Sequence, residues 1–71
     1  MASWVVYIIE KRGHYYAGMT TDLPHRLRQH QVAVAKYAEA QPSRHAAAQR
    51  ERQIKGWSRA KKERLWTAGG R

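Results

Sequence analysis

Arg26 and His30 place a positive charge and a titratable ring four residues apart in a segment that predicts a helix. Both border the apolar stripe formed by Leu23, Leu27 and Val34. Arginine commonly holds anions, and histidine commonly moves protons near neutral pH. The simpler interpretation is an amphipathic border, in which Arg26 extends its charge to water and His30 is packed or solvated. For either residue alone, the simpler interpretation is preferred.

Glu51 occupies a row with Ala47 and Ile54 that predicts the inward face of a second helix. A carboxylate on such a face is costly unless it is paired, protonated or bound to a metal ion. An ion pair with a basic neighbour and a functional role explain this position about equally well. The neighbours available for such a pair are Arg44, Arg50 and Lys55.

Tyr7 and Tyr16 lie near the middles of two segments that predict paired strands. Their simplest role is packing and cross-strand contact. Because Tyr15 and Tyr16 are consecutive, they must point to opposite faces of the strand, so one of them is expected to be exposed or beside a cleft.

Basic residues are concentrated toward the C-terminus. Eight Lys and Arg residues lie between positions 44 and 64, opposed only by Glu51 and Glu63, with Trp57 and Trp66 between them. Basic helices carrying aromatic rings suit phosphate contact and base stacking, although a charged run is often only a solvated face. The imbalance favours nucleic acid as the partner. The residues expected to contact it are Arg50, Lys55, Arg59, Lys61 and Lys62.

The whole chain has 71 residues and a formal charge of +9, and it contains no cysteine. This length predicts one domain, residues 1–71, with a small core. The absence of cysteine excludes disulfides and a thiolate zinc site. No apolar run reaches the roughly 20 residues that span a membrane, and no basic segment at the start suggests a secretory signal. The charge favours a polyanion as partner.

The sequence predicts a β-hairpin followed by three helices, an α+β arrangement. Residues 4–9 form a β-branched and aromatic run typical of a strand buried on both faces, and residues 14–19 follow as its partner. Gly18 indicates a bulge or a close approach within this second strand. The first helix is expected to start after Asp22 and to end near positions 36–40. Further helices are expected at 44–55 and 59–66, with a frayed tail at 67–71.

Two motifs resemble the GIY-YIG nuclease superfamily. Val5-Val6-Tyr7 and Tyr16-Ala17-Gly18 are similar to the paired strand signature, which is weak by itself. The extension from Tyr16 through Thr20, Asp22 and Arg26 to His30 resembles the strand-to-helix passage of that family, and residues 50–62 resemble its downstream helices. The likeness is greatest to small stand-alone bacterial members, which are related to the N-terminal domain of an excision-repair endonuclease subunit.

This resemblance implies a metal-dependent DNA endonuclease that uses Mg²⁺ or Mn²⁺ in the bacterial cytosol or nucleoid. It further implies branched or damaged DNA as the substrate, in repair or recombination. By matching position, Tyr7 and Tyr16 are the signature tyrosines, and Arg26 is the helix arginine that would hold a phosphate oxygen. His30 would act as a base or proton shuttle, and Glu51 is the metal-binding carboxylate. In this scheme Tyr7 accepts a proton from water if its pKa is lowered by Arg26 and the metal.

One departure from the family pattern bears on this interpretation. Members normally have a third strand between the two helices, but residues 37–45 contain no β-branched residue. The sequence therefore predicts a sheet truncated to a hairpin, and a homodimer formed through the exposed edge of residues 4–9. A catalytically impaired nucleic-acid-binding module and an RNA-associated basic protein are the alternatives.

Overall fold

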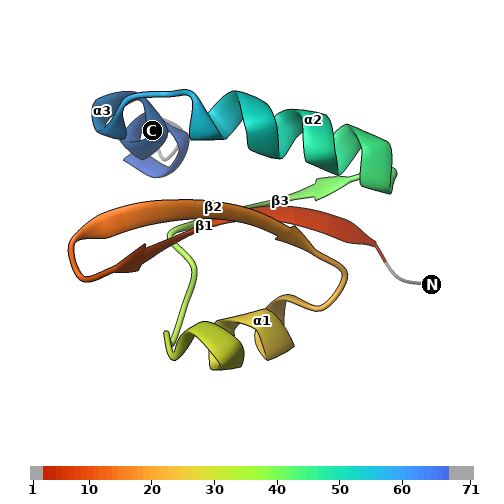
Figure 1. Cartoon of the computed structure of the whole chain (residues 1–71), viewed down its shortest axis with the longest axis horizontal. Helices are drawn as coiled ribbons and strands as arrows, with labels where there is room; N and C mark the ends of the chain where they lie inside the picture. The colour runs from red at the N-terminus through yellow and green to blue at the C-terminus, as the bar shows by residue number, and fades with distance from the viewer. Residues whose placement is uncertain (1–2, 68–71) are drawn as a thin grey trace.

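The computed structural model describes residues 3–67. Its described part is α+β, with a three-stranded antiparallel sheet and three helices. Helices α2 and α3 cover one face of the sheet and α1 covers the other (Figure 1). The elements in chain order are β1 Trp4–Lys11, β2 His14–Thr20, α1 Leu23–His30, β3 Tyr37–Gln41, α2 Arg44–Lys55 and α3 Arg59–Thr67.

The first strand is the centre of the sheet. The strand order is β2-β1-β3, and β1 is antiparallel to both neighbours. The four consecutive residues Val6–Ile9 are buried, which confirms a strand covered on both faces. The expected hairpin sheet is wrong, because β3 supplies the third strand. The expected exposed edge of residues 4–9 is wrong for the same reason, since both edges of β1 are paired within the chain.

Strand β3 forms without β-branched residues because it pairs with β1 and is joined to α2 by a polar network. Ala38 pairs across the strands with Tyr7, so the two alanines of β3 lie on the Tyr7 face of the sheet and the other three side chains lie on the α2 face. Tyr37 and Gln41 each donate a hydrogen bond to Glu39. The Arg50 Nε of α2 donates to Glu39 at 2.9 Å. Backbone pairing with β1 and this polar network outweigh the low strand propensity of the segment.

The larger core lies between the sheet and the two C-terminal helices. Val6 and Ile8 of β1 pack against Ala47 and Ile54 of α2, and all four are fully buried. Partly buried aromatic side chains from both strands and helices surround them. The inward row predicted for the second helix is therefore confirmed at these two α2 positions.

The opposite face of the sheet carries Tyr7 and Ile9, since side chains alternate along β1. Helix α1 begins at the Asp22 cap, whose carboxylate accepts a hydrogen bond from the backbone N–H of His25 at 3.1 Å. The expected helix end near positions 36–40 is wrong. The helix ends at His30, because Gln31 takes a left-handed conformation with φ of 60°. Val34 lies outside the helix and is 72% exposed, so it does not extend the apolar stripe.

The two C-terminal helices begin and end close to the predicted positions. Ser43 caps α2 by accepting from the N–H of Ala46, and Ser58 accepts from Lys61 at the start of α3. Thr67, expected in the frayed tail, belongs to α3, and positions 68–71 of that tail lie outside the described residues. Within residues 3–67 no helix has the length and apolar character needed to cross a membrane.

Candidate active site

Tyr7 is the centre of the candidate site. Its cross-strand neighbours are Gly18 on β2 and Ala38 on β3, two small residues that leave room for the ring. A Cβ atom built on Gly18 would overlap the Tyr7 hydroxyl, which shows that the ring lies across β2 at this glycine. Tyr7 is only 4% exposed. The close approach predicted at Gly18 is confirmed, and it is made by a side chain of the same chain.

The Tyr7 hydroxyl is affected by groups from two different helices. Burial raises its pKa above the ordinary 10.0, the positive charge of Arg26 opposes that rise, and the negative charge of Glu51 adds to it. The net direction is upward, so without metal the hydroxyl is protonated at neutral pH. As expected, the charge of Arg26 acts to lower the pKa of Tyr7, but the effect of burial is larger.

Helix α1 brings Arg26 and His30 to the Tyr7 side of the sheet. The His30 ring centroid lies 6.4 Å from that of Tyr7 at a tilt of 57°. Arg26 is partly buried, and within residues 3–67 its Nε is buried without any hydrogen-bond partner. A buried donor without a partner is costly, so this atom is suited to a ligand that supplies an acceptor.

Glu51 forms the ion pair that its sequence position left open as one interpretation, and its functional role stays a prediction. Its carboxylate pairs with Lys55 one turn later at 3.2 Å, and its side chain is 21% exposed. The same carboxylate adds to the upward shift of the Tyr7 pKa. Because the ion pair involves an exposed lysine, it is weak and leaves the carboxylate accessible to a cation.

Tyr16 shares the Tyr7 face but lies apart from the other candidates. It pairs across the strands with Ile9, and it is 49% exposed. Its ring contacts that of His14, with centroids 6.5 Å apart. In the described part of the chain it makes no hydrogen bond or ring contact with Tyr7, Arg26 or Glu51. Tyr15 points to the opposite face and packs on Trp66, which confirms the expected division of the two rings.

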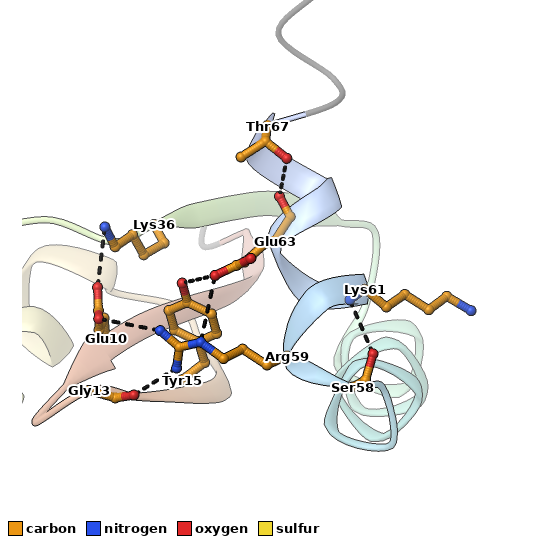
Figure 2. Close-up of polar contacts among 9 residues, drawn as sticks. All are labelled: Glu10, Gly13, Tyr15, Lys36, Ser58, Arg59, Lys61, Glu63 and Thr67. Carbon is orange, nitrogen blue, oxygen red and sulfur yellow. Dashed lines mark hydrogen bonds and ion pairs between the residues drawn. The ribbon is translucent and has the colours of Figure 1, made fainter.

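Arg59 makes contacts that bind α3 to the β1–β2 turn, as Figure 2 shows. Its guanidinium stacks over the Tyr15 ring at 3.9 Å and donates to the Gly13 carbonyl at 2.6 Å. It also pairs with Glu10 at 3.7 Å and with Glu63 at 3.6 Å. Arg59 was predicted to bind nucleic acid, and these contacts assign it a structural role that sequence reasoning missed.

Three more of the predicted nucleic-acid contacts have partners within the protein. Arg50 binds Glu39, and its guanidinium lies 5.3 Å from the Trp57 ring centroid. Lys61 lies over the same ring at 4.7 Å, and Lys55 pairs with Glu51. Lys62 makes no ion pair among residues 3–67. Contact of these residues with nucleic acid stays a prediction, and the structure indicates that Arg50 contributes to the β3–α2 contact.

Arg44 was not selected as a site residue, but it lines a pocket together with Arg26. The remaining lining residues are Trp4, Met19, Thr20 and Thr21. The available sequence signal was the position of Arg44 at the first residue of a helix, directly after a Ser cap. That signal alone does not identify a site, because it does not reveal the neighbouring Arg26.

A divalent cation fits this site only in a coordination shell with few protein ligands. In the part of the chain that the structure describes, no group of three or more His, Asp or Glu side chains is arranged to hold a metal. Glu51 is the carboxylate whose charge contributes to the raised pKa of Tyr7. Mg²⁺ commonly binds one or two carboxylates and keeps waters or substrate phosphates as its other ligands, so one glutamate suits it.

Comparison with known proteins adds no relative: no family model, curated protein or solved structure matches this chain. The site is therefore interpreted from its own geometry and chemistry.

Proposed function

We propose that this protein is a divalent-metal-dependent DNA endonuclease of the GIY-YIG type. The observation that carries the proposal is the geometry on the α1 face of the sheet, where Tyr7 is held against Gly18, the His30 ring lies 6.4 Å from the Tyr7 ring, and the buried Arg26 Nε has no partner. Arg26 comes from α1 and Glu51 from α2, and their charges shift the pKa of Tyr7 in opposite directions. Phosphodiester hydrolysis is accelerated by a cation that binds the phosphate and by a metal ion held on a carboxylate, because both stabilise the charge that develops on the phosphate.

Each residue has a role that its surroundings support. Arg26 binds a nonbridging phosphate oxygen, because its buried Nε lacks an acceptor in the protein. Tyr7, protonated at neutral pH, donates a hydrogen bond to the phosphate or orients the attacking water. His30, beside the Tyr7 ring, accepts a proton from that water, a common role of histidine. Tyr16 is exposed on the same face and positions the bound strand.

Glu51 holds Mg²⁺ or Mn²⁺ in this scheme. Such an ion, when bound, stabilises charge on the phosphate and the leaving oxygen. Lys55 pairs with Glu51 from an exposed position and gives way at small cost, since surface ion pairs contribute about 0–1 kcal/mol.

The presence of the third strand removes the main reason for preferring a nucleic-acid-binding module without catalysis over an endonuclease. The doubt rested on a sheet truncated to two strands, and β3 completes the sheet beside Tyr7. Branched or damaged DNA as the preferred substrate is part of this proposal through the resemblance to GIY-YIG enzymes.

The test is cleavage of supercoiled plasmid and of branched DNA by the purified protein, with Mg²⁺, with Mn²⁺ and with a chelator. We expect nicking and cleavage with either metal and none with the chelator. Branched RNA of matched sequence separates a DNA enzyme from an RNA-associated protein. Binding without cleavage under every metal condition would overturn the proposal and favour the binding module.

A further inference from the structure

The pocket that Arg26 and Arg44 share lies at one end of the sheet. At this end β1 begins, β2 ends, and both α1 and α2 begin (Figure 1). Its volume is about 310 Å³, enough for a phosphate with part of a nucleoside. Trp4 and Met19 form an apolar wall, and Thr20 and Thr21 provide hydroxyl groups.

The charge of this pocket selects an anion. Two guanidinium groups line it and no carboxylate does. Neither Arg26 nor Arg44 forms an ion pair within residues 3–67, so no carboxylate there neutralises either charge. Asp22 directly follows Thr21 in the chain, and its side chain caps the start of α1. Paired arginines with neighbouring hydroxyls bind phosphate through charge-assisted hydrogen bonds.

Arg44 also lines a second pocket. Met19 and Arg44 belong to both pockets, and His45 and Ala48 of α2 complete the second. The two hollows therefore adjoin at Arg44 and form a path along the first turns of α2. Arg26 connects this path to the Tyr7 site.

We propose that the pocket lined by Trp4, Arg26 and Arg44 holds a phosphate of an unpaired DNA strand. The attached nucleoside lies against Trp4 and Met19. An aromatic and apolar wall accepts a base only when that base is free of its partner strand, whereas stacking on a ring requires no particular sequence. The proposal rests on the proposed function for the identity of the cleaved strand. It assigns Arg44 as a positioning residue for this unpaired strand.

Binding without metal tests this proposal independently of cleavage. A short single-stranded DNA is titrated into isotope-labelled protein, and the Trp4 indole N–H resonance is assigned with a Trp4→Phe variant. We expect this resonance to shift on titration. A duplex of the same length is expected to bind more weakly and to leave the resonance nearly unmoved.

The variant Arg44→Gln is compared with Arg52→Gln, which removes the same charge from an exposed position on the same helix. We expect Arg44→Gln to weaken single-strand binding about tenfold. It should also lower the slope of log affinity against log salt by about 0.7, the contribution of one phosphate on a single strand. Arg52→Gln should change neither quantity to that extent.

Three results would overturn the proposal. The first is that Arg44→Gln and Arg52→Gln weaken single-strand binding equally. The second is that the Trp4 resonance does not shift when single-stranded DNA is added. The third is that inorganic phosphate saturates the pocket at concentrations as low as those of the oligonucleotide. Because these measurements contain no metal, their outcome is separate from the cleavage assay. A protein that cleaves DNA but fails here would retain its function without this subsite.

Discussion

The phenol ring of Tyr7 lies against Gly18 of the neighbouring strand so closely that a Cβ atom on Gly18 would overlap the Tyr7 hydroxyl. Tyr7 is central on β1, and Gly18 is its cross-strand partner on β2. The missing side chain at position 18 therefore determines where the hydroxyl lies. That position brings the hydroxyl within the influence of Arg26 and Glu51.

Gly18→Ala is expected to displace the Tyr7 ring and to destabilise the protein by about 1–3 kcal/mol, the usual cost of overpacking. Gly56→Ala is the matched control, because its added Cβ would meet its nearest neighbour at an ordinary 3.5 Å. Urea unfolding of the two variants measures the difference. A Gly18→Ala protein as stable as the control would show that Tyr7 is free to move away from β2.

The charges around Tyr7 predict opposite shifts of its titration in two variants. Arg26→Gln removes the charge that favours tyrosinate and should raise the Tyr7 pKa further, whereas Glu51→Gln should lower it relative to the wild type. Ultraviolet difference titration, with Tyr7→Phe in each background to isolate this hydroxyl, measures both shifts. Shifts of the same sign would mean that the two helices do not converge on Tyr7.

The raised pKa of Tyr7 in the wild-type protein predicts a loss of stability at alkaline pH. A group whose folded pKa is raised contributes stability that is complete below its unfolded value, here 10.0, and that is lost as pH rises through the folded value. Tyr7→Phe should therefore flatten the alkaline fall of the unfolding free energy. An unchanged fall in Tyr7→Phe would assign it to other groups.

The hydrogen bonds of Glu39 predict that the β3–α2 contact weakens at strongly acid pH. Burial acts to raise its pKa, but hydrogen bonds from Tyr37 and Arg50 lower it below the ordinary 4.5. The resulting stability is present above 4.5 and is lost as pH falls through the lower folded value. Glu39→Gln should lose less unfolding free energy than the wild type between neutral and strongly acid pH.

The control for Glu39 is Glu10→Gln, which removes a carboxylate that makes only exposed ion pairs, to Lys36 and Arg59. Urea midpoints across the acid range compare the three proteins. If Glu39→Gln and the wild type lost stability in parallel, the Glu39 network would not be what holds β3 to α2.

Much of this fold could be predicted because local signals agree with the final structure. The buried run in β1 and the caps Asp22, Ser43 and Ser58 are patterns of neighbouring residues, and they correctly placed a strand and three helix starts. Strand β3 was missed because its stability comes from pairing with β1 and from Arg50, not from its own residues. Local propensity does not contain that information.

The candidate site was only partly predictable for the same reason. The resemblance selected Tyr7, Arg26, His30 and Glu51 from their positions in the chain. Arg59 and Gly13 of the β1–β2 turn are 46 residues apart in the sequence, and no spacing rule predicts a contact between them. The pocket role of Arg44 likewise depends on residues brought together from three other segments.

The central claim is that Glu51 and Tyr7 belong to one metal-dependent nuclease site. It is tested most directly by the single-turnover rate at which wild-type protein, Glu51→Gln and Glu10→Gln cleave a flapped DNA in Mg²⁺. Both variants remove one negative charge, and only Glu51 acts on Tyr7. We expect Glu51→Gln to lower the rate at least about 100-fold, since losing one preorganised electrostatic contact typically costs 10²–10³. Glu10→Gln should stay near the wild-type rate. Equal rates for the two variants would contradict the account.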